Sequence, residues 1–99
     1  MSTLADVLTI LQSKVSRAAK TRCRGCSQPI GEGIDDSRLI TRFDLEPLPN
    51  LAAEDEAWAA GETTLGLTRD GWLYRRCAKW RSGGHGALIV LEHECEPRS

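Results

Sequence analysis

Aromatic and methionine side chains are scarce in this chain of 99 residues: phenylalanine, tryptophan and tyrosine together make up 5% of it, and methionine occurs once. The core is therefore expected to be mainly aliphatic. No stretch approaches the roughly 18 consecutive apolar residues of a membrane-spanning helix, so we expect no membrane association. The first residues also lack a basic segment followed by an apolar one, the pattern of a secretory signal peptide. We therefore expect a cytoplasmic protein.

Charge of one sign is not in excess either, because 13 basic and 14 acidic residues leave a formal net charge of −1. Such a balance permits anion binding through local basic patches but does not demand a nucleic-acid partner. The length allows one domain, and domains of this size often need a metal ion or a disulfide to be stable. Because we expect a reducing compartment, the four cysteines are expected to be metal ligands or free thiols.

Hydrophobic periodicity predicts an α+β fold in a single domain. Apolar residues at helical spacing indicate an amphipathic helix over residues 3–19, which fills the N-terminal segment 1–20. Short strands are predicted over residues 37–43, 63–68, 72–76 and 87–91. We expect residues 21–97 to form a small antiparallel sheet that packs with two helices and is stapled by a zinc site.

The second predicted helix is short and rich in alanine. Asn50 is a suitable N-cap for residues 51–60, and Gly61 is a suitable residue to end the helix. The acidic run over residues 54–56 is expected to form its solvated face.

Two pairs of metal-type ligands stand far apart in the sequence. Zinc is usually held by four nitrogen or sulfur ligands in a tetrahedron, supplied as two close pairs. Cys23 and Cys26 fit one pair, with Gly25 giving the flexibility that a tight turn needs. His93 and Cys95 fit the other, because residues i and i+2 of a strand share a face. The sequence predicts one structural zinc ion in this set, whose four protein ligands leave no position for a reacting water.

Cys77 keeps the ligand set open. An all-thiolate site would combine Cys77 with the other three cysteines and leave His93 spare, and another set or no metal are further alternatives. We favour the set that contains His93 because of its compact spacing to Cys95, whereas Cys77 has no ligand-type residue within several positions. Outside a metal site, Cys77 would be a small apolar residue of the sheet, and His85 a solvated side chain of a glycine-rich loop.

The order of several short motifs along residues 22–95 resembles that of a known group of proteins. The motifs are Cys23-x-x-Cys26, Asp44-x-x-Pro47-Leu48, Ala60-Gly61, Arg69-Asp70 and Val90-Leu91-Glu92-His93-Glu94-Cys95. They resemble small zinc-finger proteins of actinobacteria and their phages, whose function is mostly unassigned. The resemblance implies zinc bound by Cys23, Cys26, His93 and Cys95, and it implies no reaction.

A weaker likeness connects the chain to the zinc finger of poly(ADP-ribose) polymerases. It rests on the first cysteine pair with Pro29-Ile30 and on residues 72–77. Tyr74 stands where that finger has a histidine ligand, so its binding of DNA breaks is not carried over.

Two functions follow from these features as hypotheses. The first is a non-enzymatic, zinc-stabilised interaction module, a phage or host regulatory protein that contacts a protein partner or self-associates through its N-terminal helix. The second is a nucleic-acid-binding zinc protein, in which cationic side chains contact phosphates and an aromatic ring stacks on a base. The residues of this alternative are Arg75, Arg76, Lys79, Trp80 and Arg81. An enzyme would require a metal with an open coordination position.

Overall fold

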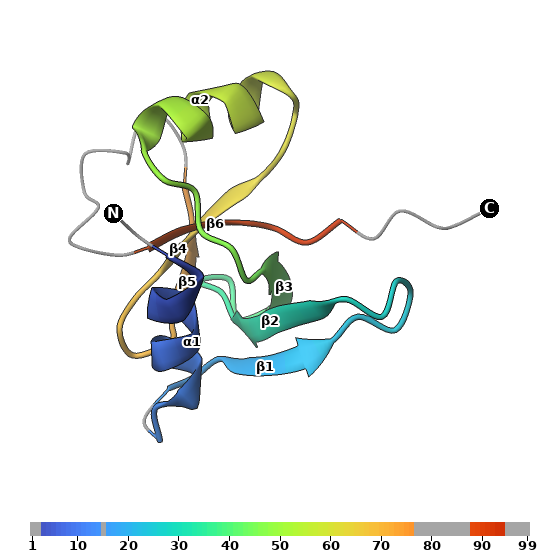
Figure 1. The fold of residues 1–99 in the computed structure, drawn as a ribbon, viewed down its shortest axis with the longest axis vertical. Coiled ribbons are helices and arrows are strands. Elements are labelled where there is room, and N and C mark those ends of the chain that lie inside the picture. Colours follow the sequence, from blue (N-terminus) through green and yellow to red (C-terminus); the bar gives the residue numbers. More distant parts are fainter. Residues whose placement is uncertain (1–2, 15, 77–87, 95–99) are drawn as a thin grey trace.

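The computed structural model describes residues 3–14, 16–76 and 88–94 of the chain. Within these ranges there are two helices and two antiparallel sheets of three strands each, which confirms the predicted α+β class. Two sheets thus stand where we expected one. Helix α2 and the first sheet lie at opposite ends of the long axis, with the second sheet between them (Figure 1). No helix among the described residues is long and apolar enough to cross a membrane.

The N-terminal helix α1, Leu4–Gln12, is amphipathic but shorter than predicted. It begins with a capping box at Thr3, which satisfies backbone N–H groups that have no partner inside the helix. The prediction that it extends over residues 3–19 is wrong. Beyond the helix, the backbone N–H of Arg17 donates to the carbonyl of Asp70 at 2.8 Å instead of to a carbonyl of the preceding turn. This contact with a distant turn redirects the chain into the first strand.

The first sheet has the order β1-β2-β3, with β1 at Ala19–Arg22, β2 at Pro29–Ile34 and β3 at Ile40–Asp44. We did not predict β2, because Pro29 and Gly31 are residues typical of a turn. One of them, Gly31, pairs with Phe43 of β3. A side chain at Gly31 would overlap the aromatic ring of Phe43, which is fully buried. The glycine therefore makes room for the largest side chain of the core.

The second sheet has the order β5-β4-β6, with β4 at Thr64–Leu67, β5 at Leu73–Arg75 and β6 at Leu88–Leu91. β4 and β5 are joined by the predicted turn, where Gly71 has a φ of +80°. That value lies in the left-handed region, which glycine adopts without strain. The three predicted strands of this region are present, with somewhat shorter bounds.

The two sheets meet where β3 passes the end of β6. Phe43 and Glu92 form an isolated β-bridge, and the backbone N–H of His93 donates to the carbonyl of Arg42 at 2.9 Å. The core lies between α1 and both sheets and is almost entirely aliphatic, as expected. It consists of Val7, Leu11, Ala18, Phe43, Leu45, Leu65, Leu67, Leu73 and Val90.

Helix α2, Leu51–Ala59, is capped by Asn50 as predicted, but its acidic run is not all solvated. The side chain of Glu54 is fully buried. Its carboxylate accepts two hydrogen bonds from the guanidinium of Arg76, one of them at 3.1 Å, and a third at 2.9 Å from the hydroxyl of Thr64. A buried carboxylate needs such partners, because burying a charge without them is very costly. We call this group the Glu54–Arg76 ion pair.

Candidate metal centre

Cys23 and Cys26 lie on the turn that joins β1 to β2. The turn is closed at its base, where the N–H of Cys23 donates to the carbonyl of Gln28 at 2.9 Å. Inside it, the N–H of Ser27 donates to the carbonyl of Cys23 at 2.8 Å, and Ser27 itself has a φ of 61°. Few non-glycine residues adopt this conformation, so these contacts hold a tight turn against its cost. The predicted cysteine knuckle is therefore a defined turn, not a flexible loop.

His93 comes two residues after β6 and is held at two points by β3. Its backbone N–H donates to the carbonyl of Arg42, and its ring Nδ1 lies 2.8 Å from a carboxylate oxygen of Asp44. The His93 side chain is only 5% exposed. Because both partners belong to one strand, the position of the ring depends on the first sheet and on the bridge that joins the two sheets.

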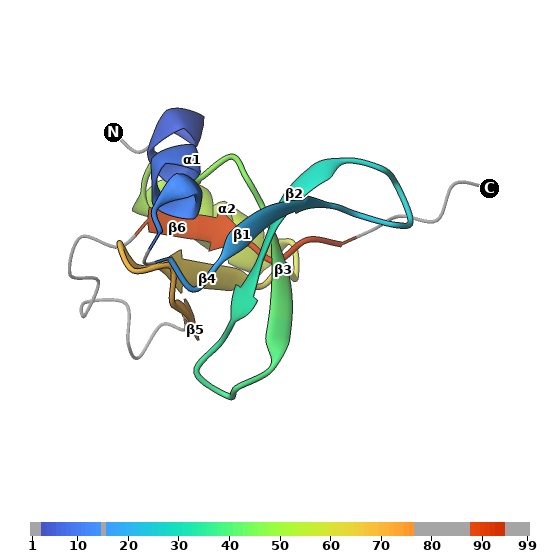
Figure 2. The same cartoon turned by 90° about the horizontal axis from the view of Figure 1, so that it is seen from below.

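The ligand atoms of Cys23, Cys26 and His93 all lie within 4.8 Å of one another. The Nε2 atom of His93 is 3.5 Å from the sulfur of Cys26. A tetrahedral zinc ion with bonds of about 2.3 Å to sulfur and about 2.0 Å to nitrogen separates two such ligands by roughly 3.5 Å. The observed separation thus fits two ligands of one metal ion. In Figure 2 the segment after β6 runs towards the β1–β2 turn, where this group forms.

The lowered pKa of Cys23 favours metal binding, whereas the raised pKa of His93 opposes it. Hydrogen bonds from the backbone of Cys26 and then of Gly25 lower the pKa of the Cys23 thiol to about 6, although burial acts in the opposite direction. Burial disfavours the charged ring of His93, but hydrogen bonding to Asp44 and to the two cysteines outweighs it and raises the pKa of His93 to about 9. At neutral pH a metal would therefore meet a Cys23 thiolate and would displace a proton from His93.

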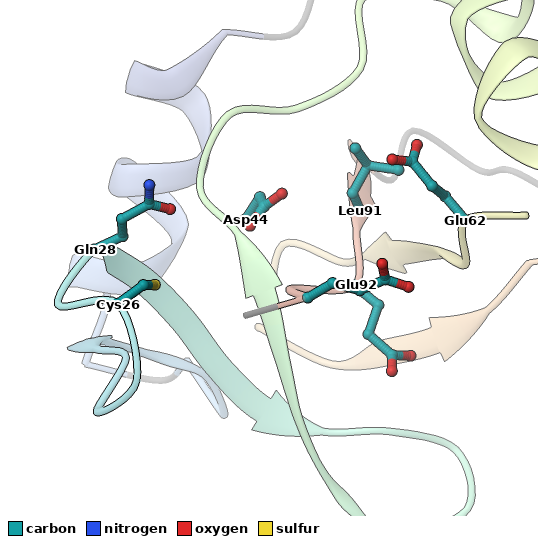
Figure 3. A pocket seen from close by; sticks show the side chains of 7 residues that line it. Cys26, Gln28, Asp44, Glu62, Leu91 and Glu92 are labelled. Atoms are coloured by element: carbon teal, nitrogen blue, oxygen red, sulfur yellow. The ribbon is translucent and has the colours of Figure 1, made fainter. Parts of the chain in front are cut away.

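A cleft of about 380 Å³ adjoins the group. Figure 3 shows Cys26 and Gln28 on one wall, Glu62, Leu91 and Glu92 on the other, and Asp44 between them. Cys26 is half-buried and faces this cleft, whereas Cys23 is buried. Solutes can therefore reach the group from the side of Cys26.

Three of the four predicted metal ligands are brought together. Cys95, the fourth, lies outside the described residues, as does Cys77, the residue of the alternative all-thiolate set. The ligand set therefore stays a prediction with respect to these two cysteines. The convergence of Cys23, Cys26 and His93 is a property of the described chain.

The basic segment predicted as a nucleic-acid contact is described only at Arg75 and Arg76. Arg76 is buried in the Glu54–Arg76 ion pair and offers no charge to a phosphate. Arg75 is about half exposed and lies within 4 Å of carboxylate oxygens of Asp35 and Glu92. Lys79, Trp80 and Arg81 lie outside the described residues. Both described arginines are thus paired with carboxylates of the chain itself.

Sequence reasoning missed the contact between the Asp44 carboxylate and the His93 ring. Asp44 is 49 positions from His93, and its contact with the ring arises only because β3 passes the end of β6. An aspartate at the end of a predicted strand carries little signal by itself.

No family model matches the chain, and neither the curated proteins nor the solved structures compared with it give a significant match. The resemblance to actinobacterial and phage zinc fingers therefore stays a prediction.

Proposed function

We propose that the protein is a non-enzymatic interaction module whose fold is stabilised by one zinc ion. The observation that supports this most is the convergence of two cysteine sulfurs and one imidazole from segments 67 positions apart. Thiolates with an imidazole form a ligand set typical of zinc, and zinc sites of this composition are commonly structural. With Cys95 as the fourth ligand, the site would be closed to a reacting water.

A metal at this point would stabilise the fold because it would join two parts of the molecule. The cysteine turn belongs to the first sheet, and His93 continues the segment of β6 in the second sheet. Between the sheets, the described contacts at this place include a β-bridge at Phe43 and a backbone hydrogen bond at Arg42. A metal bond added there would resist separation of the sheets, and its binding energy would count as folding energy.

The end of the β2–β3 hairpin is the surface that best supports a protein partner. Among the described residues, Ile34, Leu39 and Ile40 are large apolar side chains exposed by 40%, 60% and 71%. The turn between them is braced by Asp35, whose buried carboxylate accepts hydrogen bonds from the N–H groups of Ser37 and Leu39. Such a turn presents its apolar side chains in fixed positions, so binding would order few additional groups.

Nucleic-acid binding receives less support. Arg75 and Arg76 are both paired with carboxylates, so within the described residues the predicted basic segment offers phosphate no unpaired cation. A protein that binds phosphates non-specifically needs several such cations.

Metal content tests the zinc site. We would measure it by mass spectrometry on the wild type, His93→Ala and Cys77→Ser, all purified without added zinc. The expected result is one zinc per chain in the wild type and in Cys77→Ser, and less in His93→Ala. A wild type without metal would overturn the proposal, and loss of zinc from Cys77→Ser with retention in His93→Ala would replace the ligand set by the all-thiolate one.

The partner surface is tested by site-specific photo-crosslinking in cells that express the protein. A photoreactive residue at Ile40 is expected to give an adduct of defined mass. The matched control is Leu51, an apolar side chain that is 49% exposed and lies on α2. Adducts at Leu51 and not at Ile40 would refute the assignment of this surface.

A further inference from the structure

The His93 ring has two nitrogens, and its surroundings distinguish them. Nδ1 lies 2.8 Å from the Asp44 carboxylate, while Nε2 lies 3.5 Å from the Cys26 sulfur. A neutral imidazole carries one N–H, and the nitrogen without the proton is the one that binds a metal. A carboxylate accepts hydrogen bonds only, so Asp44 holds the proton on Nδ1. When a metal displaces the other proton of the ring, the lone pair is thereby left on Nε2, which faces the cysteines.

We infer that Asp44 is the positioning residue of the metal centre: it fixes the tautomer and the orientation in which His93 binds the metal through Nε2. This inference rests on the metal site proposed above and adds a role for a residue outside its ligand set. A histidine ligand commonly donates its other N–H to a carboxylate, and loss of that partner typically costs 10–100-fold in metal affinity.

The geometry favours this role over that of a further ligand. The group of ligand atoms that all lie within 4.8 Å of one another contains His93 and the two cysteines but does not contain Asp44. Asp44 ends β3, and Arg42, which accepts a hydrogen bond from the His93 backbone, lies two positions earlier on the same strand. One strand therefore orients both the backbone and the ring of His93.

Solvent exposure makes the role of Asp44 measurable. Its side chain is 42% exposed and lines the cleft beside the cysteines, so replacing it leaves no buried cavity. Asp44→Ala is thus expected to spare the core while freeing the His93 ring to rotate or to change tautomer. Glu62→Ala is a matched control, because Glu62 lines the same cleft and its removal changes the charge equally. Of the described contacts of Glu62, none is with His93.

The experiment compares zinc affinity, by competition with a chromophoric chelator, in the wild type, Asp44→Ala, Asp44→Asn and Glu62→Ala. At a pH above 9, where no proton on His93 competes with the metal, Asp44→Ala is expected to lose about 10–100-fold and Glu62→Ala less than threefold. Asp44→Asn keeps an oxygen acceptor and is expected to lose less than Asp44→Ala. In parallel, ¹⁵N NMR of the zinc-loaded proteins reports the His93 tautomer, with Nδ1 protonated in the wild type. A merely structural role for Asp44 would leave that signal unchanged.

The outcomes separate the two proposals. A wild type that binds no zinc refutes the metal site itself. Zinc bound by the wild type with equal affinity in Asp44→Ala and Glu62→Ala, or through Nδ1 of His93, overturns the role of Asp44 alone. If Asp44→Ala fails to fold, the Asp44→Asn protein and the tautomer measurement on the wild type still decide the question.

Discussion

Two polar clusters join distant segments of this chain, and they do so in opposite ways. The metal corner, which consists of Cys23, Cys26, His93 and Asp44, links the first sheet to the segment after β6. The Glu54–Arg76 ion pair links α2 to the second sheet and is sealed, since its two side chains are 0% and 3% exposed. Half-buried Cys26, in contrast, faces an open cleft.

The difference teaches where the stability of this domain can respond to its surroundings. The Glu54–Arg76 ion pair is complete within the protein, because Glu54 accepts from Arg76 and Thr64, and Thr64 in turn accepts from the indole N–H of Trp58. Protons and ions in solution have little access to it. With the proposed zinc ion, the metal corner would instead depend on an ion from outside and on protons that must leave its ligands.

Removal of the metal is the largest change that we expect. Zinc contributes roughly 10–16 kcal/mol of apparent free energy in small zinc domains, which is comparable with the roughly 5–15 kcal/mol that is the whole stability of a typical protein. Adding a strong chelator to the zinc-loaded protein should therefore unfold it, as monitored by circular dichroism against temperature. A melting temperature that the chelator leaves unchanged would mean that the metal corner is not the more sensitive of the two clusters.

Breaking the Glu54–Arg76 ion pair should rank second. Arg76→Met leaves a carboxylate buried without its cation and is expected to cost about 3–5 kcal/mol of unfolding free energy, measured by urea denaturation of the zinc-loaded protein. Adding Glu54→Gln to this variant should recover part of the loss, because the amide oxygen still accepts from Thr64 and no charge is left buried.

One result would contradict the view that the two clusters are independent. If Arg76→Met lowers zinc affinity as strongly as it lowers stability, the two clusters are not independent. The double variant Glu54→Gln with Arg76→Met serves as the control, since it removes both buried charges while keeping an acceptor for Thr64.

The sequence predicted those features that depend on local patterns. The turn at Gly71, the N-cap at Asn50 and the cysteine knuckle each follow from residue types a few positions apart, and all three are present. The aliphatic run of β6 likewise predicted a strand. Local preference and tertiary structure agree at these positions.

The features that sequence reasoning missed depend on contacts between distant segments. Glu54 resembles its solvated neighbours in every local respect, and only the approach of Arg76, 22 positions away, makes its burial possible. No strand was predicted at β2, because the Phe43 ring that fills the space beside Gly31 lies on another strand and leaves no local signal. The predicted first helix was too long for the same reason, since the contact of Arg17 with the distant Asp70 redirects the chain.

The pH dependence of zinc affinity should separate the clusters further. The pKa of His93 is raised to about 9, so below that value the metal competes with one proton on the ring. The pKa of Cys23 is lowered to about 6, so above that value its thiol adds no proton to this competition. On account of His93 alone, affinity should fall about tenfold for each pH unit from 9 down to 7. Competition titrations at several pH values measure this slope.

The variant Asp44→Asn tests whether the Asp44 carboxylate causes this pH dependence. It removes the carboxylate that raises the pKa of His93, so the fall in affinity should begin at a lower pH than in the wild type. An unshifted profile would contradict this cause of the raised pKa. Arg76→Met is the control, because the Glu54–Arg76 ion pair has no described contact with His93 and should leave the profile unchanged.

The smallest effect is expected at Asn50, on the side of the sealed cluster. Its side-chain oxygen accepts from the N–H of Ala53 at 2.9 Å and caps α2 four residues before Glu54. Asn50→Ala should cost about 1 kcal/mol of unfolding free energy, the usual loss for an N-cap, and Asn50→Ser should recover most of it. Zinc affinity should not change in either variant, because the described hydrogen bonds of Asn50 are to Ala53 and Glu54 and not to the metal corner. A loss of several kcal/mol would indicate that the cap also holds Glu54 in place, so that the sealed cluster depends on the start of its helix as well as on Arg76.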